Sequence, residues 1–138
     1  MKNLIRFILT LVLAIVVVGT LSAIIIKDRP TAQSNGSNVT VRWTTLDETG
    51  VEGFQVLRRN GYSGDFSVVS GSAITPKGNN SVYEFTDSDV FKATSGLFQY
   101  KVRILNGQSP APETDVVTVS YVSSAAKRTW GSIKAMFR

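Results

Sequence analysis

Residues 97–107 read LFQYKVRILNG, and this stretch decides the fold. Apolar side chains recur in it at every second position, as Phe98, Tyr100, Val102 and Ile104. A period of two residues is typical of a β-strand that turns one face to a core and the other to water. The Asn-Gly pair at the end of the stretch indicates a turn. The sequence therefore predicts a half-buried strand followed by a change of direction.

The same alternation returns along the chain and predicts a whole β-domain. It is found in residues 39–43, 54–56, 66–68, 83–85 and 117–121, with clusters rich in Gly, Asn, Asp and Ser between them. Strands at such regular intervals, each with one apolar face, are typical of two antiparallel sheets packed as a sandwich. We thus expect an all-β sandwich of about seven strands.

Three stretches resemble one known family. Trp43 ends the run Val-Arg-Trp, residues 53–59 read GFQVLRR, and residues 98–107 alternate aromatic residues and Val into an Asn-Gly turn. Residues 38–121 thereby resemble a fibronectin type III domain, or a bacterial relative of one. The resemblance implies a fibronectin type III/immunoglobulin-like sandwich. Because the matching positions are mostly packing positions, it implies little about function.

The sequence departs from that family at two places. The family's corner tyrosine falls on Phe98, so its hydroxyl is expected to be missing unless Tyr100 supplies it through a shift of two residues. The first strand, within residues 30–37, is expected to be short and paired in the ordinary way. The alternative is an open sheet edge, at which another chain can add a strand.

An uncharged apolar run precedes the predicted sandwich. Residues 7–26 read FILTLVLAIVVVGTLSAIII, and twenty residues of α-helix span the roughly 30 Å hydrocarbon core of a bilayer. We expect a transmembrane anchor that packs through Phe7, Leu11, Ile15, Val18, Leu21 and Ile25. Lys2 and Arg6 before the run favour a cytoplasmic N-terminus and an extracytoplasmic domain, periplasmic or extracellular.

A cleaved signal peptide is the alternative interpretation of this run, and it would leave a secreted soluble binding module. Cleavage after Ala23 would place Leu21 where a small residue is required. The apolar run also continues through residues 24–26, beyond the expected cleavage point. Both observations favour retention of the segment.

Charge and composition then divide the chain. The expected parts are an anchor at 1–29, a linker or short first strand at 30–37, the sandwich at 38–122 and a basic tail at 123–138. Residues 38–122 carry seven basic and nine acidic side chains, whereas residues 123–138 carry four basic and none acidic. A nearly neutral domain argues against nucleic acid as a partner, because binding it requires a basic face.

The residue types that commonly carry catalysis are scarce. The sequence has no His and no Cys, which excludes a His-based triad, a Cys nucleophile and the usual zinc ligands. Two groups of carboxylates, Asp47, Glu48 and Glu52 and then Asp87 and Asp89, are interpreted as solvated turn residues. We expect no enzyme activity, no metal or other cofactor and no small-molecule substrate.

The tail, SSAAKRTWGSIKAMFR, has the period of an amphipathic helix. Ala126, Trp130, Ile133 and Phe137 fall on one narrow stripe, with basic residues on one flank and Met136 on the other. The candidate binding residues are Lys127, Arg128, Trp130, Ile133, Lys134, Met136, Phe137 and Arg138. Three interpretations remain open: a helix lying among lipid headgroups, a helix docked in the groove of a protein partner, and a disordered tail.

Two function classes follow from this plan. The first is a single-pass, non-enzymatic accessory subunit that binds protein subunits of a membrane or envelope complex as well as the lipid bilayer. The second is a filament or surface-structure subunit, since some pilins also place an apolar helix before a β-sandwich. Against the second, the apolar run lacks a preceding processing site and the Glu near its start that bacterial-type pilins carry.

Overall fold

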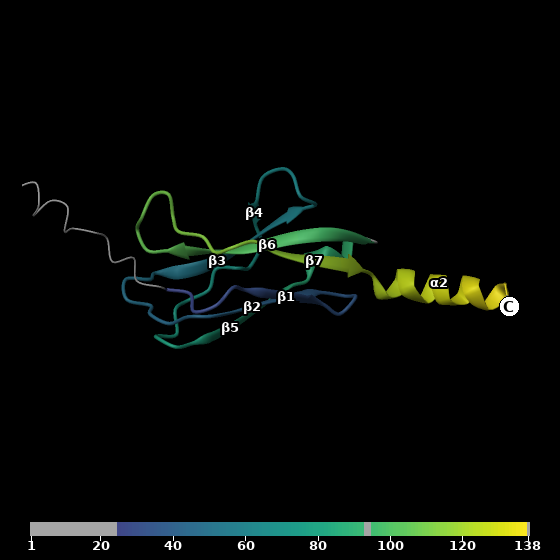
Figure 1. Cartoon of the computed structure of the whole chain (residues 1–138), viewed down its shortest axis with the longest axis horizontal. Coiled ribbons are helices and arrows are strands. Elements are labelled where there is room, and N and C mark those ends of the chain that lie inside the picture. Colours follow the sequence, from purple (N-terminus) through teal and green to yellow (C-terminus); the bar gives the residue numbers. More distant parts are fainter. Residues whose placement is uncertain (1–24, 93–94, 138) are drawn as a thin grey trace, which may run out of the picture.

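The computed structural model describes residues 25–92 and 95–137. These residues form seven strands, a short 3-10 turn and one helix (Figure 1). The elements are β1 Thr31–Ser34, β2 Val39–Thr44, β3 Gly53–Asn60, β4 Ser67–Val68, β5 Val82–Asp87, η1 Asp89–Lys92, β6 Ser95–Leu105, β7 Val117–Val122 and α2 Ser124–Met136. The strands pair antiparallel in two sheets, one ordered β1-β2-β5 and the other β4-β3-β6-β7. The all-β, two-sheet prediction is therefore confirmed.

The inward faces of the two sheets share one hydrophobic core, as the alternation predicts. β2 contributes Val39, Val41 and Trp43, and β6 contributes Phe98, Tyr100, Val102 and Ile104, all of them buried. β3 contributes Phe54 and Val56 from the same sheet as β6, and β5 contributes Tyr83 from the sheet of β2. Each buried aromatic or branched side chain of this size contributes about 1.5–3 kcal/mol of transfer free energy.

An aromatic cluster joins the two sheets near the end where β2 stops. The rings of Trp43 and Tyr83 stack with centroids 5.2 Å apart, and Phe54 from the other sheet meets Trp43 edge-on at 6.0 Å. Trp43 is 3% exposed, and its indole N–H finds no hydrogen-bond partner among the described residues. The indole therefore acts through its apolar area and its ring contacts rather than through a polar bond.

The first strand is present and paired. β1 runs antiparallel to β2 from Thr31 opposite Arg42 to Ser34 opposite Val39, and it also lies near β7. The interpretation as a short strand paired in the ordinary way is confirmed. The residues just before β1 are also bonded to the domain, because the backbone N–H of Lys27 donates to the carbonyl of Thr44 and the Arg29 guanidinium donates to the carbonyl of Val116.

The segment just before β1 also differs from the expected helix. Ile26 forms an isolated antiparallel bridge with Thr45, and the carbonyl of Ile25 accepts from Leu46. Both isoleucines pack against the core, so the expected helix does not extend over its last two residues. Of the predicted transmembrane packing residues, Phe7, Leu11, Ile15, Val18 and Leu21 lie outside the described residues. No helix in the described ranges is long and apolar enough to cross a membrane.

Two side chains differ in exposure from what the alternation predicts. Val68 is 48% exposed and its neighbour Val69 is buried instead, because β4 is only two residues long and the chain turns immediately after it. Gln99 on the outer face of β6 is 7% exposed. It accepts from Arg59 and donates to Thr118, so its amide is satisfied within the sheet.

Replacing Trp43 with Ala should destabilise the fold by about 3–5 kcal/mol, because it leaves a cavity between Tyr83 and Phe54. Trp43→Phe is the comparison, since it keeps one aromatic ring and removes the second ring of the indole together with its unpaired N–H. Urea denaturation of both variants measures the free energies of unfolding. Equal losses in the two variants would contradict the packing role of the indole.

Candidate functional site

One of the predicted surface carboxylates is buried. Glu48 is 7% exposed, and its Oε1 accepts from the hydroxyls of Thr45 at 2.6 Å and Tyr83 at 2.7 Å. Its Oε2 accepts from the backbone N–H of Gly78 at 2.7 Å. Burial by itself raises the pKa of this carboxyl, yet these hydrogen bonds outweigh it and leave the pKa below its ordinary value. Burial of the Tyr83 phenol, together with its hydrogen bond to Glu48, raises the pKa of Tyr83 to about 12.

A second carboxylate is buried at the other end of β5. Asp87 is 1% exposed and receives hydrogen bonds from the Arg58 guanidinium at 2.6 Å and the Tyr100 hydroxyl at 2.9 Å. Burial and the neighbouring Asp87 charge raise the pKa of Tyr100, so this phenol remains a neutral donor. Tyr100 therefore places its phenol hydroxyl on the Asp87 side chain at the end of β5.

These two sites correct the interpretation of the carboxylates as solvated turn residues. It is wrong for Glu48 and Asp87, each of which is saturated with donors and joins separate elements. It holds for Glu52, which is exposed, while Asp47 accepts from the backbone of Thr49 within its own turn. Among the described residues no group of three His, Cys, Asp or Glu side chains is placed to hold a metal ion.

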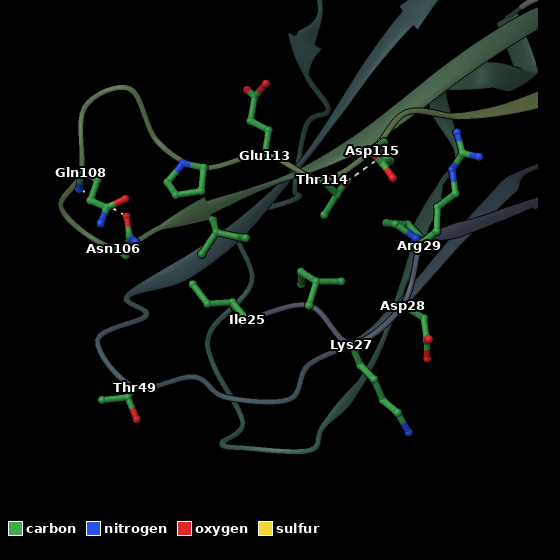
Figure 2. Close-up of a pocket in the computed structure, with 14 residues that line it drawn as sticks. Ile25, Lys27, Asp28, Arg29, Thr49, Asn106, Gln108, Glu113, Thr114 and Asp115 are labelled. Atoms are coloured by element: carbon green, nitrogen blue, oxygen red, sulfur yellow. Dashed lines mark hydrogen bonds between the residues drawn. The ribbon is translucent and has the colours of Figure 1, made fainter. Parts of the chain in front are cut away.

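A hollow of about 730 Å³ opens at the end of the sandwich where the described chain begins. Ile25 points into it, whereas Lys27, Asp28 and Glu113 point away from its middle (Figure 2). The Asn106 side chain accepts from the backbone of Gln108 at the rim, and Glu113 pairs with Lys101 and Arg103. The lining of the hollow therefore combines apolar side chains such as Ile25 with charged and polar ones, of which Asn106 and Glu113 are bonded to neighbouring groups.

The predicted C-terminal helix is present as α2, and it leaves the sandwich at the opposite end (Figure 1). None of its residues is buried. The large apolar side chains of the stripe and its flank are exposed, Trp130 by 64%, Ile133 by 39%, Met136 by 81% and Phe137 by 87%. Lys127, Arg128 and Lys134 are exposed as well, and Arg138 lies outside the described residues. An apolar stripe that meets no partner among residues 25–92 and 95–137 is typical of an interaction surface.

The start of α2 is fixed by the turn between β1 and β2. The hydroxyl of Ser123 caps the helix by accepting from Ala126, and Ser124 donates both its backbone N–H and its hydroxyl to the carbonyl of Gly36. The Tyr121 hydroxyl lies 3.4 Å from the same carbonyl. This socket, formed by Gly36 and residues 121–124, holds the first turn of the helix against the sandwich.

Gly36 is needed at the socket for two reasons. Its φ is +84°, in the left-handed region that side chains rarely adopt, and an added Cβ would lie 2.6 Å from the Ser124 hydroxyl. The turn is closed by Asn35, whose side chain accepts from the backbone of Ser37 and Asn38. Sequence reasoning missed this role, because an Asn-Gly pair indicates a turn but not what packs on it.

No protein-family model matches the chain, and no curated protein sequence matches it. The candidate site is therefore defined by the described geometry alone: a helix with an uncovered apolar stripe and basic side chains, held by its first turn at one end of the sandwich.

Replacing Glu48 with Gln should destabilise the fold at pH 7 by about 1–3 kcal/mol, because the amide meets the Gly78 N–H with a second donor. The folded-state pKa lies below the ordinary 4.5, so ionised Glu48 stabilises the fold above that pH and the effect is lost as the pH falls further. Glu48→Gln should therefore flatten the decline of stability below about pH 4.5, whereas the exposed-site control Glu52→Gln should not. Urea denaturation from pH 7 to pH 3 measures both effects, and parallel profiles would contradict the assignment.

Replacing Gly36 with Ala should release the first turn of α2, because the new methyl group displaces the Ser124 hydroxyl. Gly50→Ala is the matched control: its φ of +74° imposes similar backbone strain, and nothing lies within 4 Å of the added Cβ. Amide hydrogen exchange of residues 124–127 should accelerate in the Gly36 variant alone. Equal exchange in both variants would show that the socket does not fix the helix.

Proposed function

We propose that this protein is a single-pass, membrane-anchored interaction subunit without enzymatic activity. Residues 7–24 anchor it, the sandwich stands on the outer face of the membrane, and α2 contacts another subunit of a membrane or envelope assembly. The proposal joins the apolar run of the sequence to the exposed helix at the far end of the domain.

The observation that carries the proposal is the position of the two ends. Ile25 lies at the end of the sandwich where β2 stops and β3 begins, and α2 leaves beside the turn between β1 and β2. β6 runs between these ends, and its eleven residues at about 3.3 Å each give a separation of roughly 36 Å. A domain bonded to the residues after the anchor, with its exposed apolar helix at the other end, suits a spacer that presents a binding element away from the bilayer.

The strand order supports the fibronectin type III-like assignment that the proposal includes. In the constant-type immunoglobulin layout, the fourth strand joins the sheet that contains the first two strands. Here β4 pairs with β3 in the other sheet. Trp43 on the second strand and the Tyr100 hydroxyl at the corner between β5 and β6 agree with the same assignment.

The polar chemistry of the described residues supports a binding role rather than catalysis. The buried carboxylates Glu48 and Asp87 are fully engaged in fixing loops, and Glu113 at the hollow is paired with Lys101 and Arg103. Domains of this architecture serve many unrelated functions, so the proposal rests on the helix and not on the fold.

Retention of the N-terminal segment is the test of the anchor. The native protein should fractionate with membranes, resist extraction at alkaline pH, and have the intact mass of the full 15.0 kDa chain. Leu21→Ala is the comparison, because it supplies the small residue that cleavage after Ala23 requires. A native protein that begins at or near Ile24 and is soluble would overturn the anchor and leave a secreted binding module.

A further inference from the structure

We propose that α2 binds a protein partner whose surface offers an apolar groove with carboxylates along one rim, and that it does not lie on the membrane of its own anchor. The inference rests on the proposed function and names the partner chemistry of the same helix. Three observations carry it: the shape of the stripe, the side on which the charges lie, and the direction in which the helix leaves the sandwich.

The apolar stripe is narrow and has the period of a helix–helix contact. Ala126, Trp130, Ile133 and Phe137 are spaced by four, three and four residues. At 100° per residue these four side chains fall within about 60° of one another. Such spacing matches the a and d positions of a heptad, which insert into a facing groove, whereas a helix lying in lipid buries a wider face.

The basic side chains lie asymmetrically about the stripe. Lys127 and Lys134 follow the same flank, about 70–90° from its centre, while Thr129 and Met136 occupy the other flank. α2 contains no acidic residue, and these lysines form no ion pair within the described part of the chain. A lipid surface favours basic residues on both flanks, so one basic flank fits one acidic rim better.

The spacing of Lys127 and Lys134 also predicts the spacing of the carboxylates on the partner's rim. They are seven residues apart, which is about 10.5 Å along the helix axis. Two carboxylates at a similar spacing would meet them, as on a partner helix that carries acidic residues seven positions apart. A second copy of α2 fits less well, since it brings the same lysines and no acidic residue.

The direction of α2 separates it from the bilayer of its own anchor. The helix continues beyond β7, away from the end of the sandwich that holds Ile25 (Figure 1). Its first turn is fixed by the bonds from Ser124 to Gly36, so it does not fold back on a free hinge. The stripe is therefore displayed toward whatever faces the distal end of the domain.

The test is site-specific photocrosslinking in the full-length protein in its native membrane. A photoreactive residue replaces Trp130 or Ile133 on the stripe, with Ser132 on the opposite face as the control position. We expect a single protein adduct from the two stripe positions and none from Ser132. The crosslinked peptide of that protein should carry apolar residues flanked by carboxylates.

Reversing the charge of the two lysines is the second test of the proposed partner. Lys127→Glu combined with Lys134→Glu should lower the adduct yield by about tenfold, because both rim contacts become repulsive. The control, Ser132→Glu with Ala135→Glu, adds negative charge on the opposite, exposed face and should leave the yield within about twofold. Lysines at the two contacting carboxylates of the partner should restore binding to the reversed helix.

Three outcomes would overturn the inference. They are adducts to phospholipid from the stripe, adducts between two copies of the chain, and no adduct above that of Ser132. Membrane fractionation of the same samples keeps this result separate from the proposed function. A membrane-bound protein without a stripe adduct refutes the partner, whereas a soluble protein refutes the anchor even where the adduct forms.

Discussion

Each of the seven strands in the described ranges reverses the direction of the strand before it, and this alternation fixes where the two ends of the domain lie. An odd number of strands, and therefore an even number of reversals, brings the chain in at one end of the sandwich and out at the other. The bridge of Ile26 to Thr45 marks the entry, and the bonds of Ser124 to Gly36 mark the exit. Both ends are tied by backbone hydrogen bonds, so a force or a contact at α2 is transmitted through the paired strands rather than through a loose tether.

Two buried carboxylates stabilise opposite ends of β5. Glu48 receives three donors where β5 begins, and Asp87 receives Arg58 and Tyr100 where it ends. An unpaired buried charge would be costly, but each of these carboxylates is surrounded by donors from other elements. Removal of one donor leaves the buried charge with too few hydrogen bonds. The stability of each loop that supplies a donor therefore depends on the others, although these loops are distant in sequence. The domain needs no disulfide to hold these corners, in agreement with the absence of cysteine.

Local patterns predicted the strands, and tertiary contacts decided what the patterns left open. The alternation in residues 97–107 gave the direction of every core side chain of β6, because period two is a property of the backbone itself. It did not predict that Gln99 on the outer face is covered by a polar network. The alternation in residues 66–68 failed at Val68, where the strand is too short to impose its period. The same limit applies to the site. The stripe of α2 was predictable from its spacing, whereas the role of Gly36 depends on a contact between residues 88 positions apart.

The energetics of α2 explain why its apolar stripe is expected to bind a partner. A helix of thirteen residues is marginal in water by itself, and Gly131 in its middle lowers helix stability by about 1 kcal/mol relative to Ala. The Ser123 cap and the bonds to Gly36 offset part of that cost, but only at the first turn. The later turns, which contain Trp130 and Phe137, bury nothing within the described chain. Burial of those side chains against another surface would supply the missing stabilisation, so binding and completion of the helix are expected to be coupled.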